Sequence, residues 1–249
     1  MKNAKAIFIK QVQSLLKNPV MLFQAVLYLV LVLILSFFIG RDSDINNCTS
    51  CIPAYVCAQC TDEAASADTP NPSIAGLFTV LFVGLALAGS SSALVQEDKT
   101  TQNLRFMTMG GVKPYQYLLG TTASLFTMSF VVVVLFALAG RYFGMDMLWF
   151  VTVTATGAIV SVLLGIAIGL SKAPALAMPI SLVLGMGPML SNFNEGLARW
   201  LRFTYTQQVN LAVSNLEQSL SSNFLIIGIN GAVILLFFAW MHRKGELRW

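Results

Sequence analysis

Six long runs of apolar residues, separated by shorter polar segments, dominate the pattern of the chain. Each run holds about 18 or more residues, which is enough for an α-helix to cross the hydrocarbon core of a bilayer. The pattern therefore predicts an all-α integral membrane protein with six transmembrane helices in a single domain, residues 1–249. The expected spans are Pro19–Gly40, Ser73–Val95, Tyr115–Gly140, Met147–Ser171, Ala173–Asn192 and Asn223–Met241.

The segment before the first run, residues 1–18, is too charged to span but has the spacing of an amphipathic helix. Its apolar side chains would share one face, with lysine and glutamine largely opposite. Such a helix lies along the inner membrane surface, and the alternative is an unstructured basic tail. The apolar set is Phe8, Ile9, Val12, Leu15 and Leu16, and the polar set is Lys5, Lys10, Gln13 and Lys17.

Composition excludes a soluble domain. The 249 residues are 56% hydrophobic and only 10% charged, and little sequence remains outside the apolar runs. Soluble domains carry about 25% charged residues. The first run is also too long, and too closely followed by others, to be a cleaved signal peptide.

Basic residues are distributed unequally between the two sides that six spans would create. Eleven fall on one side and four on the other, so the positive-inside rule places both termini and the Gln96–Lys113 loop in the cytoplasm. This bias accounts for the net charge of +4 without a nucleic-acid partner, and it predicts a multi-pass protein of the inner or plasma membrane. The first set is Lys2, Lys5, Lys10, Lys17, Lys99, Arg105, Lys113, Lys172, Arg243, Lys244 and Arg248, and the second is Arg41, Arg141, Arg199 and Arg202.

The first external loop, residues 41–72, contains two CxxC pairs, Cys48/Cys51 and Cys57/Cys60. Four thiolates could hold zinc in tetrahedral coordination. Because the loop should face an oxidising exterior, disulfides are the favoured interpretation, with zinc or free thiols as the alternatives. Four cysteines allow three pairings, and the sequence does not choose among them.

The segment 193–222, between the fifth and sixth runs, carries two apolar stripes at helical spacing. They are Leu197/Trp200/Leu201 and Val213/Leu216/Leu220, with an expected break at Thr204–Asn210. Amphipathic helices dipping into the outer leaflet would explain them. In the fourth run, Gly165 and Gly169 form a GxxxG pattern suited to close helix crossing. The fifth run contains Pro174, Pro179 and Pro188, which predict a kinked or broken helix.

The segment Gln96–Gly120 is the most charged interruption between two apolar runs. From Glu97 to Met109 there is no Gly or Pro, so we expect one short helix, with Leu104, Met107 and Thr108 on a shared face. Gly110-Gly111 would end this helix, and Lys113-Pro114 would turn the chain into the next span. The alternative is a solvated loop that only connects two spans.

This segment resembles the ABC transporter type-2 permeases. The resemblance rests on Glu97-Asp98-Lys99, Leu104-Arg105-Phe106-Met107, Gly111-Val112 and Tyr117-Leu118-Leu119-Gly120, placed between the second and third spans, while Gln102-Asn103 stand where the family often has Gly-Thr. It implies that the segment is a coupling helix that docks on a separate ATP-binding subunit. It also implies an N-terminal elbow helix and short re-entrant helices before the last span. The implied ATPase contacts are Glu97, Asp98, Lys99, Thr100, Thr101, Asn103, Leu104, Arg105, Met107 and Thr108.

The resemblance further implies the permease subunit of an ATP-driven exporter. Two permease subunits, identical or related, would form the membrane part, and two ATP-binding subunits would bind ATP and Mg²⁺, with no cofactor in this chain. The uncharged spans favour an amphipathic or hydrophobic cargo such as a peptide, an antibiotic or a lipid-like molecule.

The residues themselves exclude several other functions. The chain has no GxxxxGK[ST] phosphate-binding loop, and its one histidine, His242, lies in a basic anchor at a span end. Because no ionisable residue lies well inside a span, a proton relay, an ion-coupled carrier and an intramembrane hydrolase are disfavoured. The chain is therefore not expected to be an enzyme. The rival functions are a stand-alone channel or carrier, and a membrane sensor or immunity scaffold acting through the Cys-rich loop.

Overall fold

The computed structural model describes residues 7–13, 72–140, 142–171, 174–191, 195–214 and 220–243, with four isolated positions at 26, 27, 30 and 34. Regular structure in these ranges is helical throughout, as the sequence predicts. The elements are a helix over residues 7–13, α3 (Pro72–Leu81), η3 (Phe82–Leu87), α4 (Ala88–Thr100), α5 (Asn103–Met109), α6 (Pro114–Ala139), α7 (Met145–Leu170), η4 (Pro174–Leu176), α8 (Ala177–Ser191), α9 (Glu195–Leu201), α10 (Tyr205–Ser214) and α11 (Leu220–Arg243).

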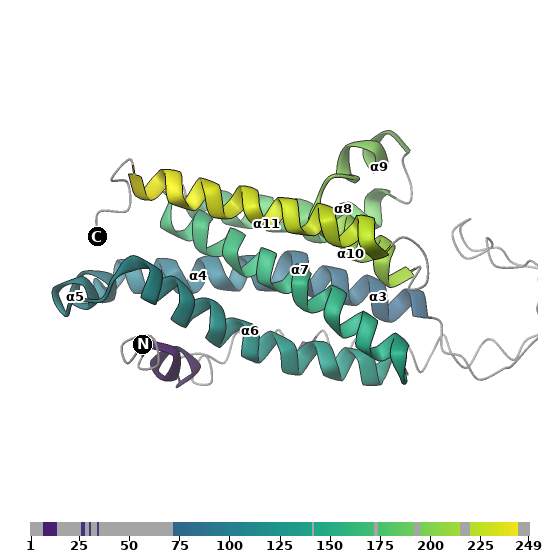
Figure 1. The fold of residues 1–249 in the computed structure, drawn as a ribbon, viewed down its shortest axis with the longest axis horizontal. Helices are drawn as coiled ribbons and strands as arrows, with labels where there is room; N and C mark the ends of the chain where they lie inside the picture. The colour runs from purple at the N-terminus through teal and green to yellow at the C-terminus, as the bar shows by residue number, and fades with distance from the viewer. Residues whose placement is uncertain are drawn as a thin grey trace, which may run out of the picture.

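The long helices lie side by side in an elongated bundle, with α5 at one end and α9 near the other (Figure 1). Four helical stretches of the described residues are long and apolar enough to cross a membrane: Gly76–Thr100, Tyr115–Ala139, Met145–Leu170 and Asn223–Trp240. They coincide with the second, third, fourth and sixth predicted spans. The first predicted span falls outside the described residues except for positions 26, 27, 30 and 34.

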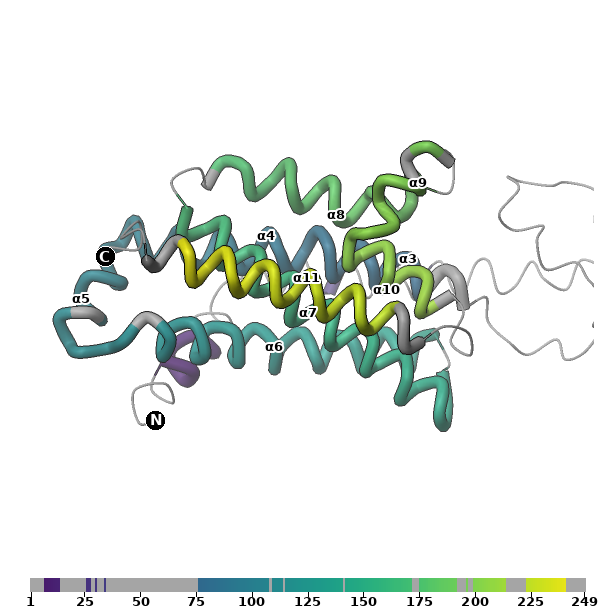
Figure 2. Tube along the Cα trace, turned by 45° about the horizontal axis from the view of Figure 1, so that its top comes forward, coloured from purple at the N-terminus to yellow at the C-terminus, as the bar shows by residue number. Residues whose placement is uncertain are grey.

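The fifth predicted span corresponds to the shorter apolar helix α8, preceded by the 3₁₀ turn η4. Pro188 lies inside α8, and the kink that the sequence predicted for this span stays a prediction. Gly185 faces η3, a π-helical segment of the second span, so closely that a Cβ on Gly84 would stand 2.7 Å from the Gly185 Cα. Figure 2 shows α6 and α8 at opposite edges of the bundle.

Helix α7 is the centre of the bundle and packs against α4, α6, α10 and α11. Its side chains Phe150, Val162 and Ile166 are fully buried. The contact with α4 depends on the GxxxG pattern, because a Cβ on Gly165 would stand 1.8 Å from Ser91 Oγ and 2.4 Å from the Ala88 carbonyl oxygen. The predicted close crossing is therefore confirmed.

Gly165→Ala is expected to destabilise the bundle by about 1–3 kcal/mol, since an added methyl group must push two backbones apart. The measurement is the free energy of unfolding of the purified protein in a denaturing-detergent titration. Gly228→Ala in α11 is the matched control, because nothing lies within 4 Å of its Cβ position. Equal stability of the two variants would contradict the close crossing.

One expectation for residues 193–222 is wrong. The expected break at Thr204–Asn210 is instead occupied by α10. Of the stripe Val213/Leu216/Leu220, Val213 belongs to α10 and Leu220 begins α11, while Leu216 lies outside the described residues. Helix α10 is not a surface helix, since it is buried against α3, α7, α8 and α11.

Two polar residues of α10, Tyr205 and Gln207, find partners on the neighbouring helices α7 and α8. The hydroxyl groups of Tyr205 and Ser161 lie 2.7 Å apart, and Ser191 Oγ donates to Gln207 Oε1 at 3.1 Å. Val209 fills the space beside Gly157, where an added Cβ would stand 2.6 Å from Val209 Cγ2. Burial of these polar groups is tolerated because each is hydrogen-bonded.

Candidate functional site

The helix α5 stands at one end of the bundle, between α4 and α6 (Figure 1). The sequence predicted one helix over Glu97–Met109, and this is wrong, because the second span continues as α4 to Thr100 and α5 starts afresh at Asn103. The break is at Gln102, whose φ of +56° is in the left-handed region. An α-helix does not continue through a residue in that conformation.

The end of α5 is formed as the sequence predicted. The Gly110 N–H donates to the Phe106 carbonyl at 3.0 Å, and Gly111 has a φ of +75°, which glycine adopts freely. Pro114 is the first residue of α6, where its missing N–H costs no hydrogen bond. The Lys113 N–H donates to Gln116 Oε1 at 3.2 Å, which caps the new helix.

A buried carboxylate, Asp98 in the last turn of α4, joins four helices at this end. Gln11 Nε2 donates to Asp98 Oδ2 at 2.8 Å and the Tyr117 hydroxyl donates to the same oxygen at 2.9 Å. Asn103 Nδ2 donates to Asp98 Oδ1 at 3.4 Å. These residues, here called the Asp98 cluster, come from the N-terminal helix, α4, α5 and α6.

The Asp98 cluster accounts for how the N-terminal helix is held. Gln11 is 2% exposed and Ile7 is 4% exposed, so this edge of the helix faces the bundle. Ile9, which the sequence placed on the apolar face, is 46% exposed, while Phe8 and Val12 are half-buried. Of the predicted amphipathic segment, only residues 7–13 lie within the described ranges.

A second interaction ties α4 to α7 at the same end. Lys99 Nζ donates to the carbonyl oxygens of Leu170 and Ser171, at 3.3 and 3.2 Å. These carbonyls belong to the end of α7, where the helix dipole favours a positive charge. The end of α4 is thus hydrogen-bonded to α5, to α6, to α7 and to the N-terminal helix.

Comparison with known proteins places this arrangement in a family. The family described as ABC-2 type transporter matches residues 2–206, which is most of the chain. The chain belongs to the ABC-2 type transporter family. A search of curated proteins and a search of solved structures found no match.

Family membership fixes the broad character of the protein. It is a multi-pass membrane permease domain, from a family that lacks ATPase motifs and pairs with ATP-binding subunits that hydrolyse ATP. The expected resemblance and the expectation of a non-enzymatic transport subunit are confirmed at this level. The match names no substrate.

The permease residues predicted to contact an ATPase do not all reach the surface. Glu97, Lys99, Thr100, Thr101 and Arg105 are exposed, whereas Asn103 and Met107 are half-buried. Asp98 is 7% exposed and Leu104 is 5% exposed, so both contact the permease itself. The side chain of Thr108 lies outside the described set.

Sequence reasoning missed the most exposed apolar residues of α5. Phe106 is 63% exposed and Met109 is 66% exposed, and their i, i+3 spacing places them on one face of the helix. Leu104 and Met107 form the opposite, inward face. Both faces of α5 carry apolar residues, so the sequence alone does not show which face is exposed. The exposed fractions of the side chains in the structure do.

Gln102 offers a test of the α4–α5 break. Gln102→Gly is expected to stabilise the permease by roughly 0.5–1 kcal/mol, because glycine adopts the left-handed conformation without steric cost. Thr101→Gly, at a φ of −78°, is the matched control and should destabilise it. Both are measured by the same detergent titration. Stabilisation by Thr101→Gly, or a loss of stability in Gln102→Gly, would contradict the break at Gln102.

Several predicted features lie outside the described residues. Cys48, Cys51, Cys57 and Cys60 are among them, so their disulfide pairing stays a prediction. Within the described ranges, no group of three or more His, Cys, Asp or Glu side chains could hold a metal ion.

Proposed function

We propose that this chain is the permease subunit of an ATP-driven exporter, and that α5 docks on a separate ATP-binding subunit. The observation that carries the proposal is the exposed pair Phe106 and Met109 on a helix that the Asp98 cluster ties to α4, α6 and the N-terminal helix. An exposed apolar pair surrounded by polar residues is typical of a protein-binding surface. Three of the exposed members of the predicted set, Glu97, Thr100 and Arg105, would form its polar rim.

The proposed mechanism follows from how short the connections of α5 are. Thr101-Gln102 alone separate it from α4, and residues 110–113 separate it from α6. Binding of ATP by two partner subunits would displace both copies of α5. Because Asn103 donates to Asp98 and Lys99 holds the end of α7, the displacement would reach the spans rather than be absorbed in a loop.

The cargo is proposed to be amphipathic or hydrophobic, such as a peptide, an antibiotic or a lipid-like molecule. In the described spans, charged side chains occur only near the ends, as with Asp98 and Asp146. Buried polar groups between the ends are hydroxyls and amides, which accommodate apolar cargo with a few polar groups. A second permease subunit, identical or related, is proposed to complete the pathway.

Co-purification tests the proposal. The full chain, solubilised in mild detergent with its native partners, should elute with a protein that carries a GxxxxGK[ST] motif. The complex should hydrolyse ATP with Mg²⁺, and the chain alone should not. If the purified chain moved its cargo without an ATP-binding subunit, it would instead be a stand-alone channel or carrier.

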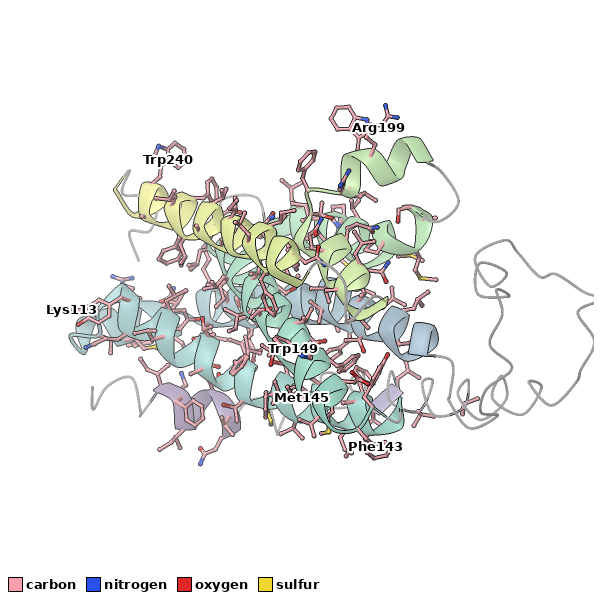
Figure 3. All side chains as sticks on the ribbon, turned by 45° about the vertical axis from the view of Figure 1, so that its right-hand side comes forward. Lys113, Phe143, Met145, Trp149, Arg199 and Trp240 are labelled. Carbon is pink, nitrogen blue, oxygen red and sulfur yellow. The ribbon has the colours of Figure 1, made fainter. Side chains whose placement is uncertain are left out.

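The proposed topology places both termini and α5 in the cytoplasm. Single cysteines from Lys113→Cys and Phe143→Cys, each in a variant whose native cysteines are replaced by serine, would be labelled on intact cells with an impermeant maleimide. Position 143, which is 68% exposed between α6 and α7, should react and position 113 should not, because the two lie at opposite ends of the bundle (Figure 3). Labelling at 113 but not at 143 would invert the topology.

A further inference from the structure

Two arginines and two aromatic residues project outward where α9 meets α10. Trp200 is 84% exposed, Phe203 is 73% exposed, and Arg199 and Arg202 are also exposed. We call these four residues the aromatic–arginine patch. Figure 3 shows Arg199 at the outer edge of the molecule, at the end far from Lys113.

The patch is built on a fixed turn. Between its members, Leu201 is 8% exposed and packs on α8, where its Cδ1 would stand 3.1 Å from a Cβ on Gly187. Gln208 Nε2 donates to the Arg202 carbonyl, and Asn230 Nδ2 donates to the Phe203 carbonyl at 3.0 Å. Amide side chains from α10 and α11 thus hold the backbone while the four patch side chains point away.

The hydrogen bond from Asn230 also fixes how deep the turn lies. The apolar span in α11 runs from Asn223 to Trp240, so Asn230 is 230 − 223 = 7 residues inside its outer end. At about 1.5 Å per residue, this is about 10 Å along the helix. With the edge of the hydrocarbon layer set at Asn223, where the apolar stretch begins, the Phe203 carbonyl, 3.0 Å from Asn230 Nδ2, lies below that edge rather than above it.

Arginine at that depth requires a partner. A guanidinium group left in hydrocarbon is costly, so its side chain extends toward the interface. Its planar fork matches the oxygens of a phosphate in two parallel, charge-assisted hydrogen bonds. Tryptophan beside it favours the same depth, since its ring is apolar and its N–H seeks the headgroup level.

We propose that the aromatic–arginine patch binds phospholipid phosphates in the leaflet farther from α5, drawing headgroups toward the bilayer centre and thinning that leaflet locally. The occupant is a lipid of the surrounding bilayer rather than a protein, because the patch lies at membrane depth and combines two cations with two aromatic rings. The inference rests on the membrane spans and not on docking of an ATP-binding subunit, so the two proposals fail independently.

The depth is tested by fluorescence of the full chain in phosphatidylcholine vesicles. A variant carrying Trp149→Phe, Trp240→Phe and Trp249→Phe leaves Trp200 as the only tryptophan. Its emission should be quenched most by lipids brominated near the headgroup end of the acyl chains, and little by aqueous iodide. Strong quenching by iodide with none by brominated lipid would overturn the proposal.

The phosphate contact is tested by solid-state NMR of the full chain with labelled arginine side chains. Phosphorus of the phospholipid should dephase guanidinium signals, and the double variant Arg199→Gln/Arg202→Gln should lose that part of the dephasing. Arg105→Gln, at the other end of the bundle, is the matched control and should retain it. Unchanged dephasing in the double variant would overturn the proposal.

A third arm separates lipid from soluble phosphate. In vesicles of a phosphorus-free glycolipid, added inorganic phosphate should produce no dephasing at these arginines. Dephasing equal to that in phospholipid would identify a site for a soluble anion and overturn the lipid assignment.

Discussion

Phe106→Asp and Met109→Asp are each expected to weaken binding of the ATP-binding subunit about 30-fold or more. Truncating a central apolar residue of an interface costs at least roughly 2 kcal/mol, and a buried aspartate adds a desolvation penalty. Each 1.4 kcal/mol is about tenfold in affinity. The measurement is the affinity of the purified permease in nanodiscs for its ATP-binding subunit, together with stimulated ATP hydrolysis.

The matched control is Gln13→Asp, an exposed residue of the N-terminal helix. It introduces the same charge on a different helix and should leave the affinity unchanged. Leu104→Asp is a poor test of docking, since Leu104 is 5% exposed and its aspartate would disturb the fold itself. Wild-type affinity in both Phe106→Asp and Met109→Asp would remove α5 from the interface.

Asp98→Leu is expected to release the N-terminal helix and α5 from the bundle while the spans stay folded. The substitution leaves three donors, on Gln11, Asn103 and Tyr117, without their acceptor. Each buried donor that loses its partner costs roughly 1–3 kcal/mol. Hydrogen exchange of the backbone amides in residues 7–13 and in α5 should accelerate about 100-fold, which corresponds to about 3 kcal/mol of local stability.

Glu97→Leu is the control for this experiment, because Glu97 precedes Asp98 in the same helix turn but is exposed. Its exchange rates should match those of the wild type. If Asp98→Leu left exchange in residues 7–13 unchanged, the Asp98 cluster would not be what holds the N-terminal helix.

The lengths of the apolar runs were enough to predict the long helices of the bundle. A run long enough to cross the bilayer has few other stable conformations. The predicted spans Tyr115–Gly140 and Met147–Ser171 therefore begin and end within two residues of α6 and α7. The second span differs, because polar residues at Gln96–Thr100 continue its helix beyond the apolar boundary. Hydropathy marks where the membrane ends, and a helix continues until a residue such as Gln102 breaks it.

The candidate site was less predictable, for two physical reasons. Gln11 and Asp98 are 87 residues apart, and no local pattern indicates that a glutamine of an interfacial helix will reach a carboxylate after the second span. In α5 the spacing correctly grouped Leu104 with Met107, but spacing does not say which apolar face meets the bundle. The same limit applies to α10, whose polar sequence resembles a loop, since the hydrogen bonds of Tyr205 with Ser161 and of Gln207 with Ser191 join residues far apart in the sequence.

Photo-crosslinking from α5 in native membranes tests the central claim most directly. A photoreactive phenylalanine analogue would replace Phe106 in one variant and Leu236, 70% exposed on α11, in another. The account predicts a covalent adduct with the ATP-binding subunit from position 106 and none from position 236. An active, ATP-hydrolysing complex that gives no adduct from position 106, or equal adducts from both positions, would contradict it.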